Sequence, residues 1–204
     1  VSTGVIVDIF DPVIPGNYGG STNPPAIVDP KDSLIAPLGD RVWGIQFNGQ
    51  LNKLFFALWV EDESNQADNQ YNAIFSVDLS IGGYPIGSPE LEILMPNLAS
   101  TNYSNPVADI AFDGDGDQML IAERTMNPSG IPNQAGAHRS RGLKYDLVGN
   151  TWVLNQIIFL GSTNPLVQNA AGGCDFGYHE EVCDSMLWFS ADNMAMFDAR
   201  RIYG

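Results

Sequence analysis

The sequence predicts an all-β protein made of repeated four-stranded antiparallel units, which is the construction of a β-propeller. Short apolar runs bounded by Gly, Pro and Asn recur along the chain, and no stretch has the periodicity of a long amphipathic helix. Phe47, Phe112 and Phe176 each end the first strand of a unit, at a spacing of about 65 residues. In the first two units the long polar insertion also occupies the same place, after the second strand.

Each unit is expected to read strand, tight turn, strand, long loop, strand, turn, strand. The strands expected in the first unit cover residues 42–47, 53–60, 73–79 and 91–96, with Asn48-Gly49 as a hairpin signal. The second unit repeats the order at residues 107–112, 118–125, 141–147 and 151–160, and the third has strands at 172–176 and 185–193. A β-sandwich with irregular loops is the alternative, but it would not explain the repeated position of the insertion.

These strands divide the chain into propeller-like units at about 40–105, 106–170 and 171–204. Residues 1–39 are expected to form an N-terminal strand at VIVDIF, residues 5–10, followed by an arm rich in Pro and Gly. Three units are fewer than the roughly four to eight blades of most propellers. We therefore expect the chain to be part of a larger ring or of an assembly, with other copies of itself or further domains of the same protein as partners.

The acidic composition limits the kinds of partner. The formal net charge is −15, so a polyphosphate backbone would be repelled and nucleic acid is not expected as a partner. No stretch approaches the ~20 apolar residues of a membrane-spanning helix, so membrane insertion is not expected either. An excess of carboxylates suits binding of divalent cations, and it equally suits the simple solubility of a secreted protein.

Three carboxylates alternate with glycine in the turn Asp113-Gly114-Asp115-Gly116-Asp117. Asp113, Asp115 and Asp117 have the spacing of the first ligands of a calcium loop, and oxygen-rich turns suit a hard cation such as Ca²⁺. An EF-hand is excluded, because Gln118 stands at the sixth position, where that loop needs Gly, and the twelfth position does not carry the required Glu. The alternative interpretation is that Asp and Gly simply tolerate the dihedral angles of a tight hairpin.

A second candidate site lies at the ends of the second strands. In a propeller the corresponding loops of successive blades gather at one end of the central channel, where a ligand would bind. Six residues at these positions form the predicted ligand-binding set: Glu61, Asp62, Glu123, Arg124, His138 and Asp192. The set suits a metal or a polar ligand, and the alternative is that these charges are solvated and pair among themselves.

The sequence offers no catalytic constellation. His138 and His179 are its only histidines, no Gly-x-Ser-x-Gly motif occurs, and the two histidines do not have the spacing of metal ligands. Paired-carboxylate hydrolysis is compatible with any chain so rich in acidic residues, and abundance alone does not argue for it.

The two cysteines, Cys174 and Cys183, lie within one predicted hairpin of the third unit. Facing strands can bring such residues within bonding distance, so we expect a disulfide, with two buried free thiols as the alternative. An oxidising, extracellular location would follow from the bond.

Three groups of segments resemble the propeller-like regions of large secreted bacterial surface proteins. They are VWGIQFNGQLNKLFFALWVEDE with IFSVDL, PVADIAFDGDGDQMLIAERT with RGLKYDL, and AGGCDFGY with MLWFSADNM and IYG. The resemblance covers roughly residues 40–204 and implies a propeller-like fold and a secreted or cell-surface location. In those proteins such regions often precede adhesin-type repeats, and the resemblance supplies no catalytic residues.

Two hypotheses for function follow. The first is a non-enzymatic, extracellular β-propeller module that serves in adhesion or in building a surface or filamentous assembly. The alternative is a calcium-dependent hydrolase or lactonase-like propeller with its site on the channel face. The absence of a catalytic constellation favours the first.

Overall fold

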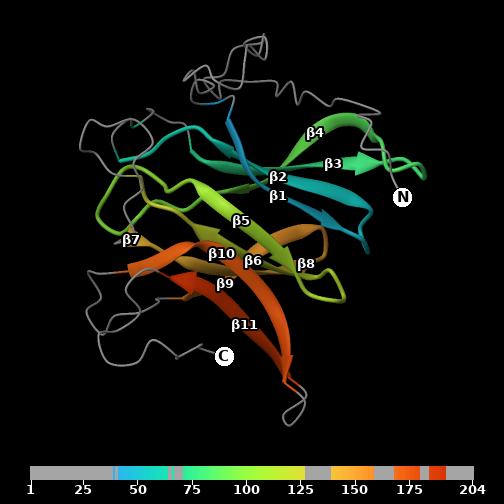
Figure 1. Ribbon diagram of the computed structural model, residues 1–204. Coiled ribbons are helices and arrows are strands. Elements are labelled where there is room, and N and C mark those ends of the chain that lie inside the picture. The colour runs from blue at the N-terminus through green and yellow to red at the C-terminus, as the bar shows by residue number, and fades with distance from the viewer. Residues whose placement is uncertain are drawn as a thin grey trace, which may run out of the picture.

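The described part of the chain forms three β-sheets (Figure 1). The structure is a computed structural model, and it describes residues 39, 41–63, 66, 71–126, 139–158, 168–179 and 184–191. Every regular element in these ranges is a β-strand, which confirms the all-β class. Within the same ranges the sheets do not close into a barrel or a propeller ring. The strand and arm predicted in the first 38 residues lie outside the described part of the chain.

The first two sheets are four-stranded antiparallel meanders with the same construction. The first has the order β1-β2-β3-β4, with strands at Arg41–Asn48, Lys53–Trp59, Ala73–Leu79 and Pro85–Leu94. The second has the order β5-β6-β8-β9, with strands at Val107–Phe112, Gln118–Glu123, Gly142–Val148 and Thr151–Ile158. The strand order predicted for the first two units is therefore confirmed.

The third sheet is built differently. Its order is β11-β10-β7, in which β10 (Gln168–His179) and β11 (Asp184–Ala191) form an antiparallel hairpin. The two-residue strand β7 (Arg139–Ser140) pairs with β10 in parallel. The sequence did not predict β7, which lies in the insertion of the second unit. Through β7, that insertion joins the second unit to the third sheet.

The sheets stack in the order of the sequence, and their first strands lie next to one another. β1 packs against β5, and β5 packs against β10. The second sheet is therefore covered on both faces, which explains the uninterrupted apolar run of β6. In β6, Met119 and Ile121 face the first sheet, whereas Leu120 and Ala122 face the third. A strand covered on both faces is apolar at successive positions, so it lacks the alternation of polar and apolar residues that is typical of a half-buried strand.

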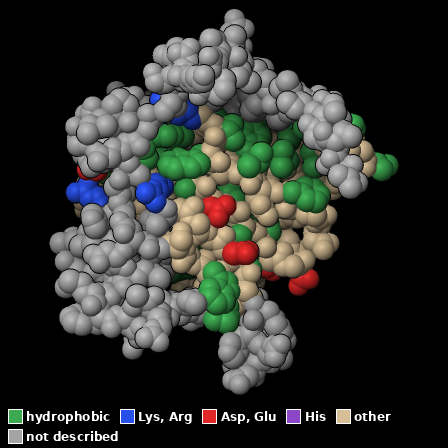
Figure 2. All heavy atoms as spheres, viewed as in Figure 1, with side chains coloured by type: hydrophobic (Ala, Val, Ile, Leu, Met, Phe, Trp, Pro, Cys, Tyr) green, Lys and Arg blue, Asp and Glu red, His purple; other side chains and the backbone are tan. Residues whose placement is uncertain are grey.

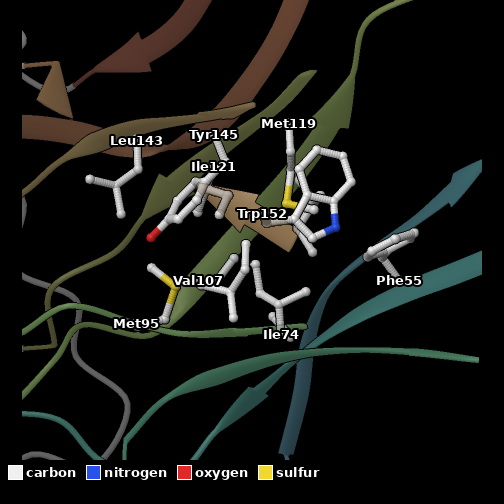
Figure 3. Packing of buried hydrophobic residues seen from close by; sticks show 12 residues of the cluster. Phe55, Ile74, Met95, Val107, Met119, Ile121, Leu143, Tyr145 and Trp152 are labelled. Carbon is white, nitrogen blue, oxygen red and sulfur yellow. The ribbon is translucent and has the colours of Figure 1, made fainter. Parts of the chain in front are cut away.

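The main hydrophobic core fills the space between the first two sheets (Figure 3). Phe55 of β2 belongs to this core, with the centre of its ring 4.8 Å from that of Phe112 and 6.0 Å from that of Trp152. Both contacts have edge-to-face geometry, which is favourable for aromatic pairs. Trp59 and Trp152 are buried, while Trp188 is half-buried and Trp43 is 36% exposed.

Gly142 allows the second and third sheets to approach closely. A Cβ at this position would lie 2.5 Å from Cζ of Phe189, inside the ring's van der Waals contact. Phe189 belongs to a second cluster, which Leu120 and Cys174 also join. A side chain at position 142 would therefore force these two sheets apart.

Several strand boundaries differ from the prediction. β4 begins at Pro85, whereas the sequence pattern placed its start at residue 91. Proline is tolerated on an edge strand, where its missing N–H removes no bond within the sheet, and this explains why the pattern was misread. The β1–β2 turn is also longer than an Asn-Gly hairpin, because Asn48 pairs with Lys53 and Asn52 takes the positive φ of 54°.

The outer face of β1 carries exposed apolar side chains. Trp43, Ile45 and Phe47 are 36%, 55% and 49% exposed. They alternate with Gly44, whose backbone lies against Asp109 of β5, so they point away from the second sheet. Figure 2 shows apolar side chains gathered over the first sheet, with scattered acidic side chains below them.

Candidate functional site

Two fully buried glutamates of the described residues lie on either side of the segment that links the first two sheets. Glu61 follows β2 and Glu123 ends β6, and both side chains are fully buried. Between them lie Ser104 and Asn105, which precede β5 and are fully buried as well. The sequence predicted both glutamates as site residues, and the structure brings them to neighbouring positions of one short segment.

Glu61 is bound to this linking segment. Its Oε1 accepts hydrogen bonds from the backbone N–H and the hydroxyl of Ser104, at 2.7 and 2.8 Å. Asn72, the residue before β3, binds to the same region. Its Oδ1 accepts from the backbone N–H of Val60, and its Nδ2 donates to the carbonyls of Glu61 and Ser104. Polar groups buried without water need such partners, so these bonds hold the end of β2 against the segment before β5.

Glu123 forms a buried bidentate ion pair with Arg141. Nη2 of Arg141 lies 2.6 Å from Oε1 and its Nε lies 2.8 Å from Oε2. The backbone N–H of Arg141 and Nδ2 of Asn105 also donate to Oε2. Burial raises the pKa of Glu123, while the hydrogen bonds and the charge of Arg141 act in the opposite direction. The two carboxylate oxygens of Glu123 thus accept four hydrogen bonds, and donors of this kind hold a carboxylate firmly in place.

Arg141 also connects the two sheets. Its Nη2 donates to the carbonyl of Pro96 at 2.7 Å, and its Nη1 donates to the carbonyl of Asn97 at 3.1 Å. Both carbonyls follow β4 of the first sheet, whereas Arg141 itself precedes β8 of the second. The guanidinium therefore holds the end of the first sheet to the middle of the second.

A second, more exposed ion pair lies beside this network. Nη1 of Arg139 donates to Glu63 at 2.8 Å and to the hydroxyl of Tyr103 at 3.2 Å. The hydrogen bond to Tyr103 and the charge of Glu63 raise the pKa of Arg139. Asn105 joins the two pairs, because its Nδ2 also donates to the carbonyl of Arg139. Its buried Oδ1 has no hydrogen-bond partner.

Asp62 and Arg124 are the two further members of the predicted ligand-binding set that the structure describes. Asp62 is buried, and its charge acts on Arg41, whose guanidinium lies 4.5 Å from the centre of the Trp59 ring. Arg124 lies on the side of the third sheet, where its Cδ would be 3.4 Å from a Cβ at Gly172. His138 and Asp192 lie outside the described residues.

The acidic turn of the second sheet is held by hydrogen bonds typical of a hairpin. Oδ1 of Asp113 accepts from the backbone N–H of Gln118, and Gly116 has the positive φ of 74° that the turn requires. Nδ2 of Asn48 donates to the carbonyl of Gly116, so the turn also rests on the first sheet. In the described part of the chain no three acidic, His or Cys side chains form a group able to hold a metal ion.

The three carboxylates of this turn lie close enough for their negative charges to affect one another. The pKa of Asp117 is raised by partial loss of hydration and by the charges of Asp113 and Asp115. The conformation of the turn is explained by the hydrogen bond that Asp113 accepts and by the contact with Asn48.

The disulfide predicted between Cys174 and Cys183 is not formed in this structure. Cys174 is a buried free thiol, and its Sγ donates to the carbonyl of Leu120 at 3.4 Å. Cys183 lies outside the described residues, so the bond between the two cysteines stays a prediction.

Sequence reasoning missed the residues that bind the two glutamates. Asn72, Ser104, Asn105 and Arg141 were not singled out, although each lies just before a strand. Small polar residues directly before a buried strand were the available signal, since their side chains can satisfy the free backbone groups there. Their pairing across two sheets leaves no signal in sequence spacing.

Comparisons of the chain with known protein families, with curated proteins and with solved structures gave no match. Among the described residues there is no helix long and apolar enough to cross a membrane.

What this arrangement can do chemically follows from its donors and acceptors. Both oxygens of Glu123 are occupied by protein donors, and Oε1 of Glu61 is occupied by Ser104. A general base or a metal ligand needs a lone pair directed at substrate or ion. The cluster therefore acts first as a connection between sheets.

Proposed function

We propose that this chain is a structural module of the β-propeller type, belonging to an extracellular surface protein or to a filamentous assembly. It serves in adhesion or in construction and has no enzymatic activity. The repeated strand order of the first two sheets supports this proposal, as does the side-by-side arrangement of β1, β5 and β10. In a propeller the first strands of successive blades surround a common axis, and here three such strands follow one another.

The observation that carries the proposal is the use made of the buried acidic residues. Glu123 binds Arg141 with both oxygens, and Arg141 in turn binds the two carbonyls that follow β4. The residues that would have formed a ligand site thus fix one sheet to the next. Such a connection suits a module that must keep its shape while it contacts other molecules. The two oxygens of Glu123 serve this connection and not the binding of a substrate.

Antibody labelling of source cells tests the location. Antibodies raised against the purified chain should label intact cells as strongly as permeabilised ones, and an antibody against a cytoplasmic protein is the control. Labelling that requires permeabilisation would contradict the extracellular role.

A hydrolysis assay tests the alternative, a calcium-dependent hydrolase or lactonase-like propeller. The purified chain should not hydrolyse lactones or phosphoesters above the rate of the Asp62→Asn and Glu123→Gln variants, with or without Ca²⁺. Hydrolysis that depends on Ca²⁺ and is lost in either variant would favour the enzyme and overturn the structural role.

A further inference from the structure

Each of the first two sheets has two edge strands, β1 and β4 in the first and β5 and β9 in the second. β1 and β5 pack against each other, whereas β4 and β9 each have one edge to which no other described strand is paired. A free edge presents a row of backbone N–H and C=O groups to which another strand can bind, so proteins commonly protect it. β4 is protected in several ways at once. It contains Pro85 and Pro89, a glycine at φ 78°, two glutamates, and two irregularities in its pairing with β3.

β9 has almost none of these protections. Its sequence TWVLNQII contains no proline, no glycine and no charged residue, and its pairing with β8 has one irregularity. Val153, Leu154 and Ile157 are 46%, 37% and 38% exposed. An eight-residue uncharged strand with exposed apolar side chains is suited to accept a further strand along its edge.

We propose that β9 pairs in an antiparallel manner with β9 of a second copy of this chain, so that two four-stranded sheets join into one continuous sheet. A contact of this kind places the same segment on both sides of a two-fold axis, so the segment must be compatible with itself. An uncharged strand meets this condition, because like charges facing each other across an antiparallel pair are destabilising. The inference rests on the proposed function, since it names the partner of the structural module.

The charge of the chain favours a second copy over other partners at this edge. With a net charge of −15, two copies repel each other over most of their surfaces. The uncharged strand β9 adds nothing to this repulsion. A basic peptide would be attracted to the acidic surface elsewhere and would gain no attraction of charge from this strand.

A lysine at position 153 tests the contact without damaging the fold. Val153 pairs with Asp146 of β8, so Val153→Lys places its ammonium beside a carboxylate within its own sheet. Ile86→Lys is the matched control, because Ile86 of β4 is 51% exposed and pairs with Asp78 in the same way. Both variants add one positive charge at a sheet edge.

Sedimentation velocity over a series of protein concentrations is the experiment. The unmodified chain should form a dimer as its concentration rises. Val153→Lys should raise the apparent Kd of this dimer about tenfold or more, because each copy then brings one positive charge to the shared edge. Ile86→Lys should leave the Kd unchanged. Hydrogen exchange should show backbone amides of β9, and not those of β4, becoming protected on dimerisation.

Three results would overturn the inference: a monomer at every concentration, equal effects of the two lysine variants, or protection on another strand. These failures differ from failure of the proposed function. A monomeric chain that antibodies detect on intact cells would refute the β9 contact and leave the extracellular module standing, and a dimeric chain found only inside cells would do the reverse.

Discussion

Replacing Arg141 by methionine should strongly destabilise the fold. The substitution keeps much of the apolar stem but leaves Glu123 fully buried without its cation, and it removes the donors to the carbonyls of Pro96 and Asn97. Breaking a buried ion pair on one side costs about 3–5 kcal/mol. For a chain of this length, each kcal/mol lowers Tm by about 2–4 °C, so the expected loss is roughly 10 °C.

Urea unfolding followed by tryptophan fluorescence is a suitable assay, because Trp59 and Trp152 are buried in the native state. Arg139→Met is the matched control. Arg139 also pairs with a glutamate at 2.8 Å, but its side chain is 54% exposed. The loss of such an exposed pair should cost less than about 1 kcal/mol.

The double variant Glu123→Met, Arg141→Met completes the test. Replacing both partners of a buried pair by apolar side chains is often neutral or stabilising, so the double variant should be more stable than Arg141→Met alone. The reasoning would be refuted if Arg141→Met lost no more stability than Arg139→Met, or if the double variant lost the sum of the two single changes.

Three further predictions concern the third sheet and the acidic turn. Gly142→Ala should lose about 1–3 kcal/mol in urea unfolding, because its Cβ would overlap the Phe189 ring, and a smaller side chain at position 189 should restore part of the loss; an unchanged midpoint would contradict the close approach of the two sheets. Burial raises the pKa of the Cys174 thiol, so in a Cys183→Ser variant it should react slowly with a disulfide reagent until urea unfolds the chain, and fast reaction with the native protein would count against its burial. Because the folded-state pKa of Asp117 is raised, ionisation of this group opposes folding, and Asp117→Asn should raise Tm at neutral pH but not at a pH well below the carboxyl pKa; an equal effect at both would exclude the charge as its cause.

The positions of the central strands of the first two sheets could be predicted because their side chains are mostly buried on both faces. Runs such as FFAL in β2 and MLIA in β6 remain apolar without alternation, and the tight turns between them carry Asn, Asp and Gly. β7 could not be predicted, because its two residues have no periodicity and are defined only by their parallel pairing with β10.

The candidate site was predicted only in part, and the reason is geometric. Glu61 and Glu123 were found because acidic residues at the ends of apolar strands are conspicuous in sequence. Their partners Ser104 and Arg141 come from distant parts of the chain, and only the stacking of the two sheets brings them together. The disulfide stays a prediction, since Cys183 lies outside the described residues, and the register of the β10–β11 hairpin places Phe189 opposite Cys174.

A high-resolution experimental structure of the protein, determined in the presence of Ca²⁺, tests the structural role of the acidic residues most directly. The account predicts that both oxygens of Glu123 remain on Arg141, and that further sheets or a second copy continue the series begun by β1, β5 and β10. An ion coordinated by Glu123 or Asp62, with Arg141 displaced from the carboxylate, would contradict it.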